Sequence, residues 1–204
     1  MLDLQQIDLN CFIMEGFMDR RVQYTKKVIT ETFINLLEKK DISSITVTKL
    51  CSLADINRAT FYRYYLDVYD LLKQIENDFI LEIRNSSSME SLPKNSIYDF
   101  TIGILEIFLL HKKLVKILFN TNRNVYFLNE VLEVAYEKCM TLWEERMPES
   151  SEAEVEYALV FAFNGALGVI NYWIKNDFND NIEDIANLIT DCCKYGIRKY
   201  LGSE

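Results

Sequence analysis

Apolar residues recur at steps of three and four along almost the whole chain, and this spacing constrains the fold more than any other feature. The spacing places apolar side chains on one face of a helix, whereas a half-buried strand alternates at every second residue. Only six glycines and two prolines occur among the 204 residues, so few positions interrupt the pattern. The sequence therefore predicts an all-α protein, and with 50% hydrophobic residues it is apolar enough to form a core.

Breaks in the pattern divide the chain into about nine helices. The clearest break is the polar, serine-rich segment 85–95, which is typical of a loop. Thr46 and Asn57 each precede a short apolar pattern and are expected to cap the helices that follow. The expected helices cover residues 21–39, 47–54, 58–65, 68–84, 97–110, 112–119, 125–146, 152–175 and 182–200.

Positive charge is concentrated in one part of the chain, although the net charge is −9. Residues 18–66 hold nine Lys and Arg against five Asp and Glu, whereas residues 85–204 hold eleven against eighteen. A small basic head on an acidic body is typical of a protein that binds nucleic acid through one domain. We therefore expect a leader at 1–17, a DNA-binding head at 18–66 and a body at 67–204.

The two short helices of the head are separated by the turn-like sequence Ala-Asp-Ile-Asn at 54–57. Two helices joined by so short a turn form a helix-turn-helix if they can cross closely, and Cys51 supplies the small side chain that this crossing needs. The apolar residues expected to face inward are Val47, Leu50, Leu53, Ile56 and Phe61. Arg58, Ala59, Tyr62 and Arg63 are then left on the outer face, with Asn57 and Thr60 at its edge.

This outer face suits the major groove of DNA. Arg58 can donate two hydrogen bonds to a guanine or a phosphate, and Tyr62 offers a hydroxyl to phosphate and a ring to a thymine methyl. Core packing explains Phe61 and Tyr65 but cannot explain Arg58 and Tyr62 in the same register.

The run ITVTKLCSLADINRATFYRYYLDVYDLL at 45–72 closely resembles the N-terminal domain of TetR/AcrR-family transcription regulators. The segment at 155–189 resembles the last two helices of the same family's ligand-binding and dimerisation domain. The resemblance implies a three-helix head, a linking fourth helix and a C-terminal helical bundle. It also implies a cytoplasmic homodimer, usually a repressor that a small apolar or aromatic effector releases from palindromic operator DNA.

The resemblance also implies which residues touch DNA. Thr46 and Thr48 match positions that contact phosphate, and the recognition helix supplies base or backbone contacts. Together with Arg63 on the outer face, the predicted DNA-binding residues are Thr46, Thr48, Asn57, Arg58, Thr60, Tyr62, Arg63 and Tyr64.

The sequence departs from the family pattern at three places. Asp55 replaces a usual glycine, which Asp tolerates in a left-handed conformation. Leu66 and Val68 replace lysines that usually clamp phosphate, so an alternative stays open: a TetR-fold coactivator or interaction protein that does not bind DNA itself. Residues 1–17 have no family counterpart and are expected to be a disordered extension or a misplaced start. The cations that could compensate for the missing lysines are Arg20, Arg21, Lys26, Lys27, Lys49, Arg58 and Arg63.

Small residues at helical spacing leave a smooth stripe on each of the last two helices. Two such helices from each of two subunits can form a symmetric four-helix interface, although packing within one chain is the alternative. The predicted dimer interface consists of Ala158, Ala162, Gly165, Ala166, Val169, Ile185, Leu188, Ile189 and Cys192.

Other functions lack support in the sequence. One histidine and no nucleophile elbow, phosphate loop or HExxH motif argue against an enzyme, and no metal or cofactor is predicted. Five scattered cysteines fit reduced thiols in a cytoplasm. Cys192 and Cys193 are expected to be buried small hydrophobic side chains, and an oxidant sensor is the alternative. No run long enough to span a membrane is expected. Aromatic residues of the body could line an effector cavity with His111, Asn164 or Asn171 as polar anchors, but no ligand residue is assigned.

Overall fold

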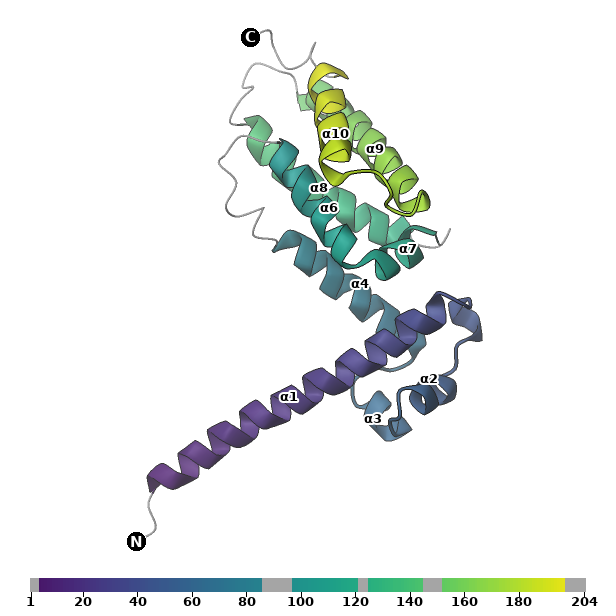
Figure 1. Ribbon diagram of the computed structural model, residues 1–204. Helices are drawn as coiled ribbons and strands as arrows, with labels where there is room; N and C mark the ends of the chain where they lie inside the picture. Colours follow the sequence, from purple (N-terminus) through teal and green to yellow (C-terminus); the bar gives the residue numbers. More distant parts are fainter. Residues whose placement is uncertain (1–3, 86–96, 121–124, 145–151, 197–204) are drawn as a thin grey trace. The chain divides into compact units, whose positions relative to one another are not determined.

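The computed structural model describes residues 4–85, 97–120, 125–144 and 152–196, and in these residues every regular element is helical (Figure 1). The all-α prediction is confirmed. The helices are α1 (Leu4–Leu37), α2 (Val47–Leu53), α3 (Arg58–Tyr62), α4 (Val68–Arg84), α6 (Ile97–Leu110), α7 (Lys112–Asn120), α8 (Val125–Glu144), α9 (Glu152–Lys175) and α10 (Ile182–Gly196), with a 3₁₀ turn at Ile42–Ser44.

Helix bounds agree closely with the sequence pattern in the body and less well in the head. The bounds of α4, α6 and α9 are those predicted. The predicted leader is not a separate segment, because residues from Leu4 onward form the beginning of α1. Helix α3 is shorter than predicted, since the N–H groups of Tyr64 and Tyr65 both bond the carbonyl of Phe61 in a tightened last turn.

The chain divides into two compact units, Met1–Ile75 and Glu76–Glu204, so the division falls inside α4 rather than before it. In the first unit α2 packs against α1 and α3 against α2. The fully buried side chains of this unit are Ile29, Phe33, Leu50, Phe61 and Leu71. They come from all four helices, so a single small core fixes the direction in which α3 presents its outer face.

The turn between α2 and α3 has the geometry that the sequence predicts. Asp55 adopts a φ of 52°, the left-handed conformation that Asp tolerates. The N–H of Ile56 then bonds the carbonyl of Cys51 at 3.1 Å. Cys51 is buried, and burial raises the pKa of its thiol, while the positive charge of Arg58 partly offsets that rise. The thiol therefore stays protonated and acts as the small side chain that lets the two helices cross.

The prediction that Leu53 faces inward is wrong, because 51% of this residue is exposed. The buried residues at this end of α2 are Leu50, Cys51 and Ala54. Successive residues of a helix are about 100° apart, so Leu53 points roughly 100° away from the mean direction of these three buried side chains. Apolar spacing alone cannot separate these neighbouring directions on a helix of seven residues.

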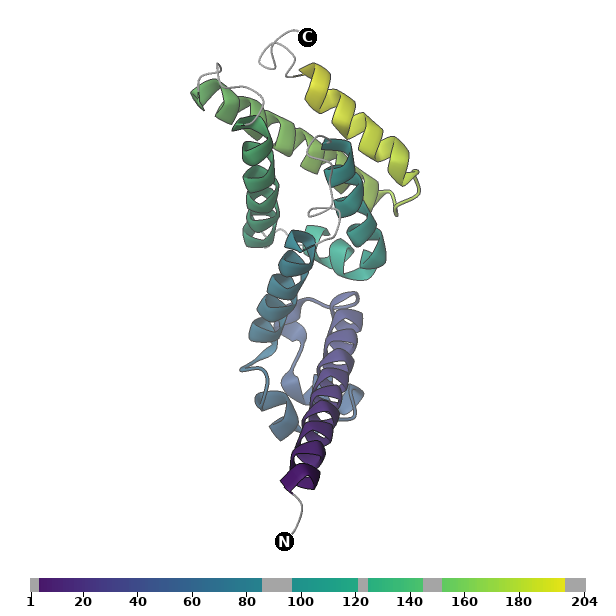
Figure 2. The ribbon, with the colours of Figure 1, turned by 90° about the vertical axis from the view of Figure 1, so that its left-hand side faces the viewer.

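The second unit holds the end of α4 and helices α6 to α10. Helix α10 packs on α6 and α9, and α7 and α8 pack on α9 (Figure 2). Phe79 of α4 stacks on Phe127 of α8 at 5.9 Å between ring centroids and contacts Phe108 of α6 at 6.0 Å. Phe119 of α7 completes this aromatic cluster. The end of α4 is therefore part of the core of the second unit.

A well-formed cap sets the angle between α9 and α10. Asp177 and Phe178 both have positive φ, and the N–H of Phe178 bonds the carbonyl of Trp173 at 3.0 Å. The rings of Trp173 and Phe178 meet edge to face at 4.9 Å, the apolar contact that accompanies such a cap. An ion pair between Asp177 and Lys116 of α7 holds the turn from the other side, and this hydrogen bond lowers the pKa of Asp177.

Candidate nucleic-acid interface

Side-chain hydrogen bonds cap the N-termini of both short helices of the head. The hydroxyl of Thr46 accepts a hydrogen bond from the N–H of Lys49 at 3.2 Å, and the amide oxygen of Asn57 accepts one from the N–H of Ala59 at 2.9 Å. Both predicted caps are confirmed. Thr46 and Asn57 are exposed, so each holds its helix while remaining at the surface that sequence analysis assigned to DNA.

Helix α3 has one buried side and one open side. Phe61 is fully buried, Tyr65 is 5% exposed, and their ring centroids lie 5.5 Å apart, which confirms that both belong to the core. Arg58, Tyr62 and Arg63 are exposed on the other side. Beside Ala59, which is also exposed, the outer face therefore presents two arginines and a tyrosine that the fold of the head does not need for packing.

Arg58 and Tyr62 form a pair on this outer face. An Nη2–H of Arg58 donates to the hydroxyl of Tyr62 at 3.4 Å, and the guanidinium carbon lies 5.8 Å from the centroid of the same ring. This hydrogen bond to the Tyr62 hydroxyl raises the pKa of Arg58, which is charged at any physiological pH. With 48% of Tyr62 exposed, the pair displays a planar guanidinium on an aromatic support.

The remaining predicted DNA-binding residues differ in how exposed their side chains are. Thr48 on α2 is exposed, whereas Thr60 and Tyr64 are half-buried. The side chain of Thr60 therefore offers less surface to a ligand than its place in the motif suggests.

The two positions that lack the family lysines differ from each other. Leu66 is 80% exposed, whereas Val68 is 6% exposed and belongs to the core of the head. Asp67 caps α4, and its carboxylate accepts hydrogen bonds from the N–H groups of Tyr69 and Asp70. The loop between α3 and α4 thus carries carboxylates and apolar side chains where a phosphate clamp would need cations.

A set of hydrogen bonds around Asp70 holds the loop between α3 and α4, and the sequence did not predict it. The carboxylate of Asp70 accepts from the N–H of Leu66 at 2.8 Å and from the amide of Gln74 at 3.1 Å. The same amide donates to the carbonyl of Tyr64 at 3.3 Å. The four-residue spacing of Asp70 and Gln74 is the sequence feature that points to these hydrogen bonds.

The cations of α1 lie in different surroundings. The ammonium of Lys26 lies 5.8 Å from the centroid of the Tyr64 ring. Lys27 instead pairs with Glu31 one turn along the same helix, at 3.9 Å. The fold therefore brings one of the candidate compensating cations to the end of α3 and pairs its neighbour with a carboxylate.

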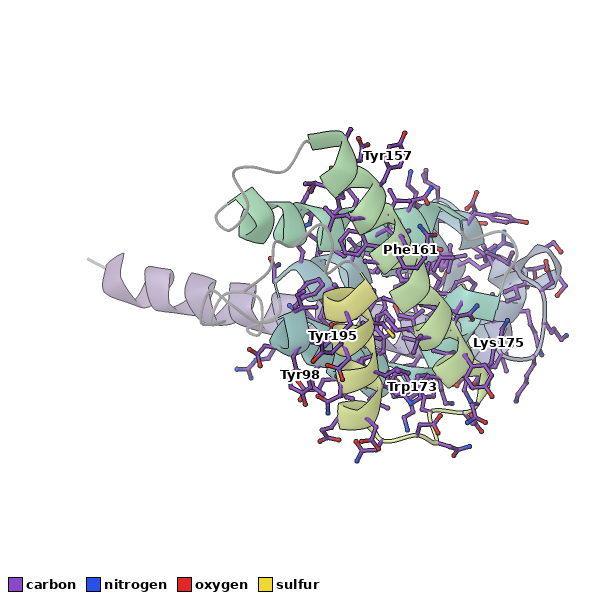
Figure 3. All side chains as sticks on the ribbon, turned by 90° about the horizontal axis from the view of Figure 1, so that it is seen from above. Tyr98, Tyr157, Phe161, Trp173, Lys175 and Tyr195 are labelled. Carbon is purple, nitrogen blue, oxygen red and sulfur yellow. The ribbon has the colours of Figure 1, made fainter. Side chains whose placement is uncertain are left out.

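A second surface lies on α9 and α10. We define the outer stripe of α9 as Tyr157, Phe161, Gly165, Gly168 and Tyr172, and the outer stripe of α10 as Leu188, Cys192 and Tyr195; all are exposed. Figure 3 shows Tyr157 and Phe161 along α9 and Tyr195 on α10. Phe161 approaches Gly196 to within 3.9 Å of the place where a Cβ would be, so the two stripes are neighbours.

The predicted dimer interface only partly coincides with these stripes. Ala158 and Ile189 are buried within the chain itself and offer almost no surface to a partner. Gly165, Leu188 and Cys192 are exposed, so the expectation that Cys192 is buried is wrong. Cys193 is half-buried, and burial raises the pKa of its thiol. The other predicted interface residues are half-buried: Ala162, Ala166, Val169 and Ile185.

Comparison with known proteins places the body in a described family of domains. Residues 95–194 match a TetR family model described as the transcriptional regulator C-terminal region. An uncharacterized HTH-type transcriptional regulator of Bacillus subtilis strain 168, YxbF, is 32% identical over 80 residues, which is 39% of this chain and 21% of that protein. The match therefore spans about a fifth of the length of this curated relative.

Solved structures share the fold along most of the chain. The dihydroxyacetone kinase operon activator DhaS is 18% identical with a TM-score of 0.65, over 87% of this chain and 98% of that one. A TetR transcriptional regulator from Streptococcus agalactiae 2603V is 21% identical with a TM-score of 0.62, over 88% and 98% of the two chains. At these identities the comparison concerns the arrangement of helices, with a helix-turn-helix head followed by a helical body.

Proposed function

Because the chain belongs to the TetR family of transcriptional regulators, we propose that it binds operator DNA through the outer face of α3. The observation that carries this proposal is the Arg58–Tyr62 pair, which is exposed while the opposite side of the same helix is fully buried. A guanidinium on a tyrosine ring is suited to guanine or phosphate, and a good bidentate contact contributes about 1–3 kcal/mol of discrimination. Thr46, Thr48 and Arg63 are proposed to contact the backbone beside it.

We propose that the regulator acts as a homodimer in the cytoplasm, joined through the outer stripes of α9 and α10. A helix-turn-helix protein that reads a palindromic operator needs two heads related by two-fold symmetry. The stripes leave large apolar side chains in water, with 78% of Tyr157 and 69% of Phe161 exposed. A contiguous apolar surface of this kind marks an interaction site.

Helix α9 also permits another explanation of its exposed stripe. Contrary to the sequence-based expectation, Val155–Lys175 is long and apolar enough to cross a membrane by length and composition alone, and 22% of its most apolar stretch is buried. A second subunit would cover the same side chains, and family membership favours that explanation. A dimer in solution without detergent would support it.

The body is proposed to bind a small apolar or aromatic effector that releases the repressor from DNA. Among the three polar anchors considered, His111 lies 2.9 Å from the carboxylate of Glu82, and Asn164 donates to the carbonyl of Val160 at 2.8 Å. The buried amide oxygen of Asn171 has no hydrogen-bond partner within the part of the chain that the structure describes. An unpaired buried acceptor is costly, so Asn171 is the favoured anchor for an effector that carries a donor.

The test is a binding titration with the promoter fragment that neighbours the gene. We expect a specific complex with the wild type, and a loss of about 1–3 kcal/mol in specific binding for Arg58→Ala at an unchanged melting temperature. Leu53→Ala is a matched control, because Leu53 is exposed on the neighbouring helix and has no assigned contact. No shift at any salt concentration would favour the alternative, a TetR-fold coactivator that does not bind DNA.

A further inference from the structure

The loop after α3 is poorly suited to hold DNA. Leu66 is exposed but apolar, and Val68 is buried. The carboxylate of Asp70 accepts from the N–H of Leu66 in this loop, and that of Asp67 accepts from the N–H of Tyr69 in the first turn of α4. Two carboxylates without a lysine or arginine between residues 64 and 72 repel a phosphate. Apart from Arg63 at the C-cap of α3, a backbone contact at this end of the helix must therefore come from another element of the head.

Lys26 of α1 reaches this place. It lies three residues before Ile29 and seven before Phe33, both fully buried, so it continues the core-facing side of α1 toward the N-terminus. Lys26 is nevertheless exposed, and its ammonium lies 5.8 Å from the centroid of the Tyr64 ring. A lysine on this side of the helix has no core to enter and instead covers the tyrosine at the end of α3.

The charge of Lys26 remains available to a ligand. In the described ranges no carboxylate lies within ion-pairing distance of Lys26, whereas Lys27 pairs with Glu31 at 3.9 Å. An aromatic ring attracts an ammonium without neutralising it, and a lysine has three donors that can turn away from the ring. Tyr64 thus positions the cation and leaves donors free for a phosphate oxygen.

We propose that Lys26, held over Tyr64, is the phosphate contact that replaces the missing loop lysines, an inference that rests on the proposed DNA-binding function. Each head then holds the DNA backbone through α1 as well as through α2 and α3. The contact is to phosphate and not to bases, so it contributes affinity and salt dependence but no sequence preference.

The test compares salt dependence among three proteins: the wild type, Lys26→Gln and Lys27→Gln. Each phosphate contact contributes about 0.9 to the slope of log affinity against log salt, so removing one contact from each of two subunits should flatten the slope by about 1.8. Lys27→Gln should change the slope by clearly less, because Glu31 already pairs with this charge. The ratio of operator to random-sequence affinity should stay the same in Lys26→Gln.

Two substitutions of Tyr64 separate positioning from packing. Tyr64→Phe keeps the ring and should retain most of the slope, whereas Tyr64→Leu removes the ring and should flatten the slope at an unchanged charge. A purely structural role would lower the melting temperature of Lys26→Gln and leave its slope unchanged.

The outcomes distinguish this inference from the proposed function. An unchanged slope in Lys26→Gln, while Arg58→Ala still loses specific binding, overturns the role of Lys26 and leaves DNA binding intact. Absence of wild-type binding at every salt concentration overturns both, since a phosphate contact requires DNA.

Discussion

Enlarging Gly165 should separate the proposed dimer without harming the subunit. A Cβ added at Gly165 would meet nothing within 4 Å in the chain, so Gly165→Leu and Gly165→Phe create no clash inside the monomer. Removing a glycine from a helix interior also favours the helix, by about 0.5–1 kcal/mol. The isolated subunit should therefore be as stable as the wild type or slightly more stable.

The cost arises only when a partner covers the outer stripe of α9. Overpacking a close contact costs about 1–3 kcal/mol, and a two-fold axis places the substitution in the interface twice. The expected loss is about 2–6 kcal/mol, which raises the dimer Kd by a factor of roughly 30 to 20,000. Phe should cost more than Leu, and Leu more than Ala, because each adds volume to the same contact.

Sedimentation velocity over a range of protein concentrations measures this shift, with thermal melting as a check on the fold. Gly165→Ala tests whether added volume is the cause, and Glu133→Leu tests an exposed position on α8 outside both stripes. A Gly165→Phe variant that sediments as the wild-type dimer, or a wild type that is monomeric at micromolar concentration, would refute the reasoning.

Further predictions follow from single side chains. Tyr62→Phe removes the hydroxyl that accepts from Arg58 and should weaken specific binding by about 1–3 kcal/mol in a titration, at an unchanged melting temperature. Leu66→Lys, at an exposed position, should tighten binding and steepen the salt slope by up to about 1.8 for the dimer. Val68→Lys should instead lower the melting temperature, because Val68 is buried and an unpaired charge there is costly. Phe178→Ala should destabilise the chain by about 3–5 kcal/mol in denaturant unfolding; a loss below about 1 kcal/mol would mean that the turn after α9 does not depend on this ring.

The sequence predicted correctly those features that depend only on residues a few positions apart. Thr46 and Asn57 cap their helices because a short side-chain oxygen reaches the free N–H groups of the next turn. The bounds of α4, α6 and α9 follow from apolar spacing and from polar breaks in the sequence. Asp55 adopts the left-handed turn because only a few residue types tolerate that conformation.

The sequence could not predict which neighbouring helix covers each side of a given helix. Helix α9 is apolar on nearly all sides, so spacing alone could not tell that Ala158 faces the chain's own core while Phe161 faces outward. Leu53 was expected inside and is exposed, since a helix of seven residues has too little periodicity to define its buried side.

The sequence by itself determined the helical class and the polar face of α3, because composition and helical period are properties of the chain alone. Only the tertiary structure decided that Lys26 lies over Tyr64, whereas the pair between Lys27 and Glu31 lies one turn apart on α1 and is local to that helix. The two lysines are adjacent and chemically identical. A rotation of about 100° between successive residues directs one toward the end of α3 and the other along the surface of α1, and the contact of Lys26 with Tyr64 exists only once α1 has packed against the other helices of the head.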